Sequence, residues 1–103
     1  LLHGHEVAAG IVSELYLSHK LCGFPSANLS QVIQYIKEYY PPFVFDCKDY
    51  ETLYELMTHD KKNEGGIINF TLLSKIGEVQ INQQVTKEKI LESLDFYRES
   101  FGV

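Results

Sequence analysis

The sequence predicts a mainly α-helical domain that carries one small β-hairpin. Four segments have apolar residues at helical spacing, which indicates amphipathic helices. Only residues 68–82 change to the two-residue alternation that is typical of strands. The chain has 103 residues, of which 45% are hydrophobic and 22% are charged. These values suit one small globular domain with a modest core.

The first predicted helix spans residues 3–21. Its apolar stripe consists of Val7, Ala8, Ile11, Val12, Leu15 and Leu21. Gly10 inside this helix costs about 1 kcal/mol relative to alanine, which is tolerable if something packs tightly there. Lys20 suits the negative end of the helix dipole, and Gly23 is a natural stop.

The second predicted helix follows Pro25. Ser26 and Asn28 are both plausible N-caps. The apolar positions have the spacing of one helix face and are Leu29, Val32, Ile33 and Ile36. Pro41 and Pro42 end this helix, because proline donates no backbone hydrogen bond and restricts the residue before it.

A third helix is predicted after a short, extended connector at residues 43–45. Asp46 and Asp49 are both candidate caps for it. Its apolar positions are Tyr50, Leu53, Tyr54 and Met57, and it is expected to end near His59.

The remaining elements are a loop, a hairpin and a last helix. Residues 60–66 read as a polar loop closed by two glycines. A strand is predicted at 68–73, a turn at 75–77 and a shorter strand at 78–82. Thr86 is the expected N-cap of the last helix, whose apolar face is Ile90, Leu94, Tyr97 and Phe101. No interdomain linker interrupts the chain, so residues 1–103 are expected to form a single domain.

Composition excludes some partners and suggests a compartment. A net charge of −5 argues against binding to a nucleic-acid backbone, which needs a basic face. No apolar run approaches the about 20 residues that span a bilayer, and no basic segment of a signal peptide begins the chain. Cys22 and Cys47 form no CxxC pair. We therefore expect no nucleic-acid or membrane partner, and two reduced cysteines in a cytoplasmic protein.

His3 is the first candidate for chemistry, because histidine is the commonest metal ligand. His3 and His5 would point about 200° apart on a helix, so they cannot easily bind one metal together. A catalytic zinc needs three protein ligands. The further candidates have no convincing ligand spacing from His3 and are Glu6, Glu14, His19 and His59. The residues alone therefore favour an ordinary exposed or core histidine over a self-contained metal site.

Lys61 and Lys62 are the second candidate. Two lysines just after a helix end are compatible with a solvated loop that complements the helix dipole. They are also compatible with an anion clamp, in which ammonium groups on a loop bind a phosphate or carboxylate. Asp60 could then cap the loop or hold a lysine in place. The serines lack the GxSxG pattern of a nucleophile elbow, and Gly65–Gly66 matches no nucleotide-binding loop.

Three stretches together resemble the 3-dehydroquinate synthase family. Leu1-Leu2-His3-Gly4, followed by Val7-Ala8 and Gly10, is similar to the family's LLHGxAVAxGM element. Asp60-Lys61-Lys62-Asn63, with Gly66 and the strand 67–73, is similar to its DKKxxxGxxxFVLL element. Ile76-Gly77-Glu78 matches its IGE turn. The chain departs from the family at His5-Glu6, where Glu-Ala is usual, and at Ile11, where methionine is frequent.

The resemblance covers the helical C-terminal domain of such enzymes. It implies a partial metal- and substrate-binding domain at residues 1–103, with the NAD-binding N-terminal domain absent from this chain. His3 matches one ligand of a divalent metal, zinc or cobalt, and the glutamate and second histidine that complete the site lie upstream. Lys61 or Lys62 matches a lysine that binds the substrate anion. No family role carries over to His5. The chain also lacks an initiator methionine, so we expect a fragment.

The resemblance also implies the reaction. In the shikimate pathway, 3-deoxy-D-arabino-heptulosonate 7-phosphate would be converted to 3-dehydroquinate and phosphate by an NAD- and metal-dependent lyase. We expect a homodimer for the full-length enzyme, and an inactive, weakly zinc-binding fragment. Two alternatives are another sugar phosphate cyclase on the same scaffold and a non-catalytic helical interaction module. Because covering helices would lie upstream, we also expect exposed apolar surface that favours self-association.

Overall fold

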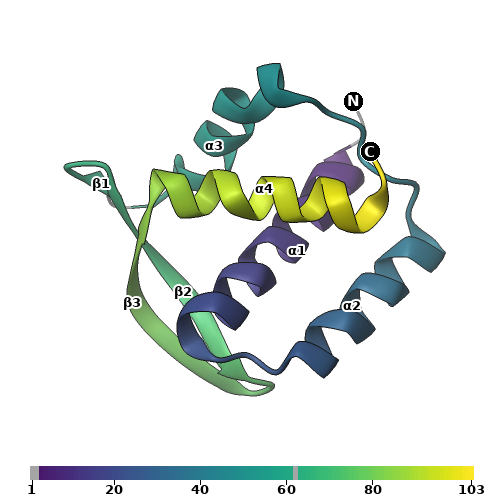
Figure 1. The fold of residues 1–103 in the computed structure, drawn as a ribbon. Coiled ribbons are helices and arrows are strands. Elements are labelled where there is room, and N and C mark those ends of the chain that lie inside the picture. The colour runs from purple at the N-terminus through teal and green to yellow at the C-terminus, as the bar shows by residue number, and fades with distance from the viewer. Residues whose placement is uncertain (1–2, 62) are drawn as a thin grey trace.

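The computed structural model describes residues 3–61 and 63–103, with side chains described from residue 7 onward within these ranges. The described residues form four α-helices and a three-stranded antiparallel sheet in the order β1-β2-β3. Helix α1 (His3–Cys22) crosses the middle of the molecule, with α4 (Lys87–Phe101) in front of it and the long β2–β3 hairpin beside it (Figure 1). The predicted mainly α fold is confirmed, and the sheet is larger than the single hairpin that was expected.

Helix α1 has core on two sides. Ala8, Ala9 and Val12 pack in a helical cluster with residues of α2 and α4. Tyr16 and Leu17, further along α1, pack in a second cluster with β2, β3 and the first turn of α4. The predicted apolar stripe was wrong at Val7, Ile11 and Leu21, which are exposed. Ala8 and Val12 of the stripe are buried as predicted, and Ala9, which was not in the stripe, is buried beside them.

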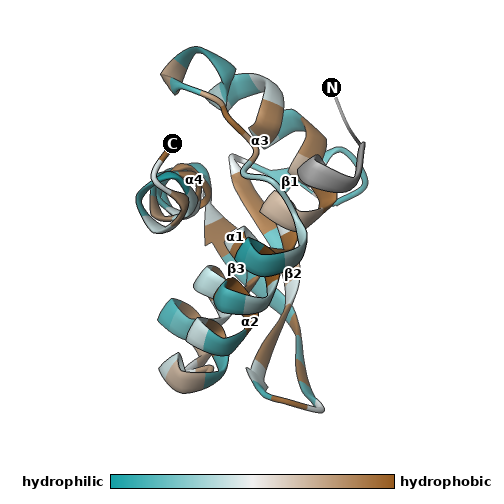
Figure 2. Cartoon of the chain, turned by 90° about the vertical axis from the view of Figure 1, so that its right-hand side faces the viewer, coloured by the Kyte–Doolittle hydropathy of each residue, from teal (hydrophilic) through white to brown (hydrophobic). Residues whose placement is uncertain are grey.

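Helix α2 (Ser26–Tyr39) buries Leu29, Ile33 and Ile36, as predicted, and Val32 packs partly against the same cluster. The predicted caps were wrong: the N-cap is Pro25, which makes no side-chain capping bond, and Ser26 is already inside the helix. Tyr40 and the two prolines follow the helix end as expected. Both α2 and α4 carry hydrophobic and hydrophilic residues, and the buried residues give each helix an apolar side (Figure 2).

Residues 43–45 form an irregular connector in which Phe43 and Phe45 are buried and Val44 is exposed. The Phe43 backbone N–H donates to the buried Tyr97 hydroxyl at 2.9 Å, which anchors the connector to α4. A short 3-10 helix, η1 (Cys47–Asp49), comes next and is capped by Asp46. The Asp49 carboxylate accepts from the Asp46 N–H at 3.1 Å and completes this capping box. Asp49 is also the N-cap residue of α3 (Tyr50–Thr58), as predicted, but its side chain makes no capping bond there.

The segment predicted as a loop contains a short strand, β1 (Asn63–Glu64), which pairs with β2 (Ile67–Lys75). Gly65 and Gly66 have φ values of 63° and 85°, the left-handed backbone of a tight hairpin turn. The Asn63 side chain accepts from the Gly66 N–H at 3.1 Å and closes this turn. The loop prediction was therefore wrong here, because two adjacent glycines are also a hairpin signal.

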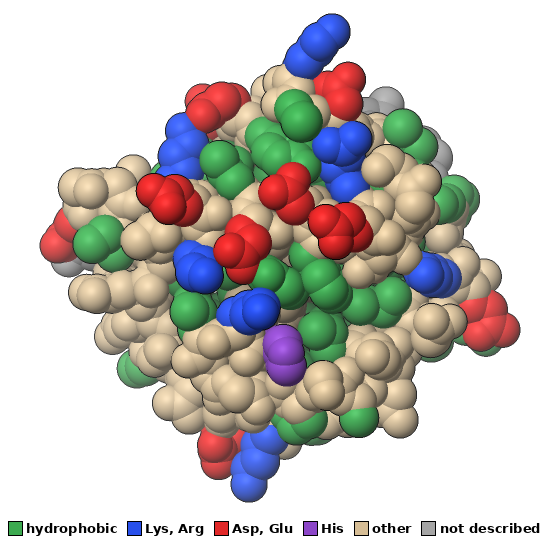
Figure 3. Space-filling model, in the orientation of Figure 1, with side chains coloured by type: hydrophobic (Ala, Val, Ile, Leu, Met, Phe, Trp, Pro, Cys, Tyr) green, Lys and Arg blue, Asp and Glu red, His purple; other side chains and the backbone are tan. Residues whose placement is uncertain are grey.

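The β2–β3 hairpin is confirmed, with β3 running over Glu78–Thr86. The expectation of a shorter second strand was wrong. Strand β3 lies at an edge of the described sheet and is mostly exposed, and its polar residues 82–84 hid the strand from a search for alternation. Thr86 caps α4 as predicted, and Ile90, Leu94, Tyr97 and Phe101 are all buried. In the view of Figure 1, charged side chains gather across the middle of the face, where α4 lies, with hydrophobic side chains between them (Figure 3).

Candidate functional site

A cavity of about 380 Å³ lies between α1, α3 and the segment that follows α3. Most of its lining is apolar, and its charged residues gather where the segment after α3 meets α1. Val7, Gly10 and Glu14 follow one another at spacings of three and four, so they share one face of α1. The remaining lining residues are Ala9, Ile11, Leu53, Leu56, Met57, His59, Asp60, Lys61 and Leu94.

Gly10 leaves this wall of the cavity open. A Cβ atom at this position would meet no described atom within 4 Å. Among the described residues, no tight packing against Gly10 offsets the helix-forming cost of glycine relative to alanine. The same open face explains why Val7 and Ile11 are exposed although they are apolar, since they line the cavity.

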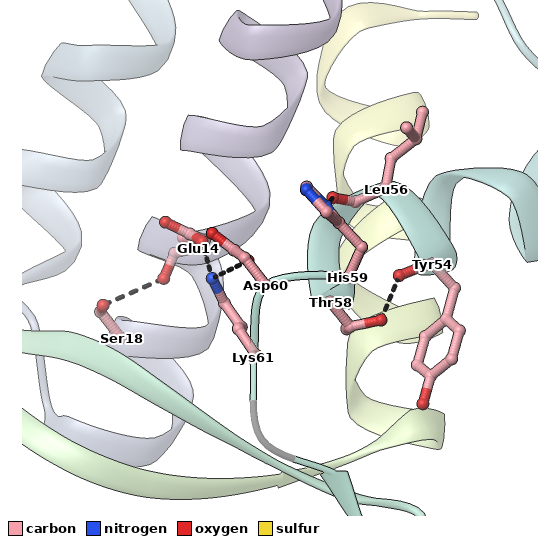
Figure 4. A network of polar contacts seen from close by, with 8 residues as sticks. All are labelled: Glu14, Ser18, Tyr54, Leu56, Thr58, His59, Asp60 and Lys61. Carbon is pink, nitrogen blue, oxygen red and sulfur yellow. Dashed lines mark hydrogen bonds and ion pairs between the residues drawn. The ribbon is translucent and has the colours of Figure 1, made fainter.

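Lys61 carries the positive charge at the polar end of the cavity. Its ammonium lies 3.8 Å from the Glu14 carboxylate and 3.6 Å from that of Asp60. Figure 4 shows Lys61 reaching from its loop toward α1, with its nitrogen between the two acids. The ammonium also lies 5.0 Å from the centre of the buried Phe70 ring, a cation–π distance. The Lys61 side chain is thus only 21% exposed.

The end of α3 sets the position of Lys61. The Lys61 N–H donates to the Thr58 carbonyl at 2.9 Å, which continues the helical turn past the last residue of α3. The Thr58 hydroxyl donates to the Tyr54 carbonyl at 2.8 Å. His59 Nδ1 lies 3.1 Å from the Leu56 carbonyl, which can only accept, so this nitrogen carries the proton. These local bonds direct the Lys61 side chain back toward α1.

The α1 side of the site is tied to the sheet through Ser18. The buried Ser18 hydroxyl donates to the Glu14 carbonyl at 3.0 Å and accepts from the Leu73 N–H at 3.0 Å. Because Leu73 and Phe70 are both on β2, the bond fixes Glu14 relative to the ring beneath Lys61. The whole polar end of the cavity is therefore held by α1, α3 and β2 together.

At the polar end of the cavity, the pKa of Glu14 is higher than that of an isolated glutamate. Burial raises the pKa of Glu14, the nearby Asp60 charge raises it further, and the Lys61 ammonium opposes both effects. Two carboxylates share one ammonium here, so the cluster carries a net negative charge when all three groups are ionised. An anion that enters the cavity is attracted by the Lys61 ammonium and repelled by the two carboxylates.

The structure describes the side chains of only some of the predicted site residues. His3 is a residue of α1, but its side chain lies outside the described residues, as do those of His5 and Glu6. Lys62 also lies outside them. Lys61 and the earlier candidates Glu14 and His59 line one cavity, whereas His19 lies in a groove between α1 and α2, with Nδ1 2.7 Å from the Phe24 carbonyl.

The described part of the chain contains neither a cluster of metal-binding side chains nor a helix that could span a membrane. Among its side chains, no group of three or more His, Cys, Asp or Glu residues could hold a metal ion. None of the described helices has the length and apolar character to cross a bilayer. Cys22 and Cys47 are free thiols, and Cys47 is exposed.

The pairing of Glu14 with Lys61 was missed from the sequence, because no local pattern links residues so far apart.

Comparisons with known proteins identify the family. The fold and cavity define a mainly helical domain with a largely apolar cavity that has charged groups at one end, a combination that is typical of small-molecule sites. Residues 1–63 match the model of the family described as 3-dehydroquinate synthase C-terminal. The chain belongs to this family. No solved structure matches it.

Curated relatives extend the comparison to the whole chain. All 103 residues are 82% identical to the 3-dehydroquinate synthase of Parabacteroides distasonis. The enzymes of Bordetella pertussis and Staphylococcus saprophyticus are 39% and 31% identical over 75% and 96% of the chain, respectively. The chain spans 29%, 22% and 28% of the length of these three relatives.

Proposed function

We propose that this chain is the C-terminal part of a 3-dehydroquinate synthase. The whole protein would convert 3-deoxy-D-arabino-heptulosonate 7-phosphate to 3-dehydroquinate and phosphate in the shikimate pathway. The observation that carries this proposal is the high identity to the Parabacteroides distasonis enzyme over every residue of the chain. The cavity between α1 and α3, with an ammonium group at its polar end, supports a role in binding an anionic small molecule.

Lys61 is the residue through which this chain would bind the substrate anion. Its ammonium lines the cavity and is held at a defined place by two carboxylates and an aromatic ring. A lysine in such a position binds phosphate or carboxylate by charge and hydrogen bonding. Lys62 is proposed as a second candidate on the family motif alone. A mainly apolar lining around the charged groups would keep water away from the bound substrate.

His3 is proposed as one ligand of a divalent metal, zinc or cobalt, on the strength of the family motif. When bound, such a metal would supply Lewis-acid polarisation of a substrate oxygen, and NAD would supply the capacity to take up a hydride. The described side chains do not form a metal site by themselves, so the other ligands, and the NAD contacts, would come from the rest of the protein. We further propose a cytoplasmic homodimer for the full-length enzyme, and an inactive isolated chain.

Replacing His3 in the full-length protein tests the metal assignment. His3→Ala should abolish metal-dependent turnover and lower the bound metal, while circular dichroism shows a retained fold. His5→Ala is the matched control, because no family role carries over to His5, and it should retain both activity and metal. Normal metal content and activity in His3→Ala would show that His3 is not a ligand.

Replacing the two lysines separately tests substrate binding. Lys61→Ala should raise KM for the seven-carbon sugar phosphate at least tenfold, because a charge-assisted contact to the anion is lost. Lys62→Ala, assayed beside it, shows whether the neighbouring lysine shares that role. Unchanged kinetics in both variants would favour the alternative that the two lysines lie on a solvated loop and do not bind the substrate. Turnover of a different sugar phosphate by the wild type would instead favour another cyclase on this scaffold.

A further inference from the structure

Lys61 is already paired before any anion binds. Its ammonium is within ion-pair distance of two carboxylates, Glu14 at 3.8 Å and Asp60 at 3.6 Å. Both distances are longer than a direct charge-assisted hydrogen bond, so these are loose electrostatic contacts. A phosphate or carboxylate that approaches Lys61 must compete with both acids and is repelled by them.

We propose that Glu14 is a competing counterion of Lys61, which holds the ammonium at the end of the cavity until an anionic group of the substrate displaces it. Glu14 is thus a positioning residue that lowers the affinity of the site for anions. This inference rests on the proposed function, in which Lys61 meets the substrate anion.

Glu14 is a stronger competitor than Asp60. The Glu14 side chain is 42% exposed and lies on the cavity wall, whereas that of Asp60 is 67% exposed. Charge interactions weaken as solvent screens them, so the more buried carboxylate has the larger effect on an anion inside the cavity. Glu14 is also fixed, since its helix is bonded to β2 through Ser18. Asp60 is on the loop beside Lys61.

Proton uptake by Glu14 is a second way in which the ammonium becomes free, beside displacement of Glu14 by the anion. Among the described residues, the charged groups that act on Glu14 are Lys61 and Asp60, both from the segment after α3, and His59 lines the same cavity. Burial and the Asp60 charge raise the pKa of Glu14. Above this raised pKa Glu14 is ionised and holds Lys61, and below it Glu14 is neutral and releases it. Anion affinity should therefore increase as the pH falls through the pKa of Glu14.

The first experiment measures steady-state kinetics of the full-length enzyme at pH 7.5. Glu14→Gln keeps the shape of the side chain and removes its charge. We expect KM for the sugar phosphate to fall about two- to fivefold, the range that corresponds to a partly exposed ion pair, with a smaller change in kcat. Glu38→Gln is the matched control, because it removes the same charge from the exposed side of α2 and should leave KM unchanged.

The second experiment follows sulfate binding by titration calorimetry in the same full-length proteins. Sulfate stays a dianion across the pH range, so any pH dependence belongs to the protein. Wild-type affinity should increase as the pH falls toward the raised pKa of Glu14, and Glu14→Gln should lose this part of the dependence. In the background of Lys61→Met, the Glu14→Gln effect should fall to the smaller part that direct repulsion of the anion contributes.

The outcomes separate the inference from the proposed function. If the wild-type enzyme does not turn over the sugar phosphate, the proposed function fails. If the wild type is active but Glu14→Gln leaves KM unchanged or raises it, the competing role of Glu14 is overturned. A Glu14→Gln effect of the same size in the Lys61→Met background would likewise overturn it, because Glu14 would then act without Lys61.

Discussion

Tyr16 and Glu92 join the two central helices through a side-chain hydrogen bond. The Tyr16 hydroxyl donates to Glu92 Oε2 at 2.5 Å, and its ring stacks on Phe96 at 4.4 Å between centroids. The bond lowers the pKa of Glu92. Burial, followed by the bond and the charge of Glu92, raises the pKa of Tyr16 from 10.0 to about 12. Both shifts favour the same pair, a protonated tyrosine and an ionised glutamate.

Tyr16→Phe should therefore destabilise the chain in a pH-dependent way. The Glu92 contribution is present above its ordinary pKa of 4.5 and is lost as the pH falls through its lowered value. The Tyr16 contribution is present below pH 10.0 and is lost as the pH rises toward about 12. We expect a loss of about 0.5–1 kcal/mol at pH 7, at the low end for a hydrogen bond because Glu92 is partly exposed.

Urea unfolding at a series of pH values measures this difference. Tyr35→Phe is the control, since Tyr35 is exposed on α2 and its loss of a hydroxyl should cost little. A difference between wild type and Tyr16→Phe that stays constant from pH 3 to pH 12 would contradict the assignment.

Site residues differ in how far the sequence reveals them. His3, Lys61 and Lys62 stand in motifs, so a resemblance to a family singles them out from the sequence. Glu14 stands in no motif, and its spacing along the helix predicts only a solvated or ligand-like carboxylate. Its contact with Lys61 depends on the approach of the segment after α3 to α1, which no local pattern encodes.

At the scale of elements, α4 begins directly where β3 ends, and Thr86 is the junction. The Thr86 side chain accepts from the Lys89 N–H at 3.3 Å and so satisfies one free donor of the first turn. The helix ends at Gly102, whose φ of 68° is the left-handed conformation that glycine adopts without strain. Both ends of α4 are therefore set by residue types that are common at helix termini.

Thr86→Ala should lower the free energy of unfolding by about 0.5–2 kcal/mol, the usual effect of removing an N-cap. Chemical denaturation of the chain measures it. Thr52→Ala is the matched control, because Thr52 is exposed within α3 and alanine is the better helix former there. Equal destabilisation by both substitutions would show that Thr86 contributes nothing specific as a cap.

At the scale of the whole molecule, the two faces of helix α1 have different surroundings. One face packs in both core clusters, and the other lines the cavity with Val7 and Ile11. Together with Leu56 of α3, these residues form an apolar patch in which each side chain is 45–49% exposed. Exposed apolar patches of this kind favour association, as we expected from the sequence for the isolated chain.

The isolated chain should self-associate through this patch. Sedimentation velocity at increasing concentration should show dimers or larger species, and Ile11→Lys should shift them toward monomer by placing a charge in the patch. Val44→Lys is the control, since Val44 is 74% exposed on the connector and away from the patch. A wild-type chain that remains monomeric at all concentrations would contradict this expectation.

The sequence by itself determined the helices, the hairpin and the family, because helical periodicity, glycine and proline positions and short motifs are local properties. It also placed Lys61 among the candidates. Only the tertiary structure decided which face of α1 is core, that β1 pairs with β2, that β3 extends along an outer edge, and that Glu14 meets Lys61. These features depend on contacts between distant segments, whose free energy comes from burial and charge in the assembled fold and leaves no spacing pattern in the chain.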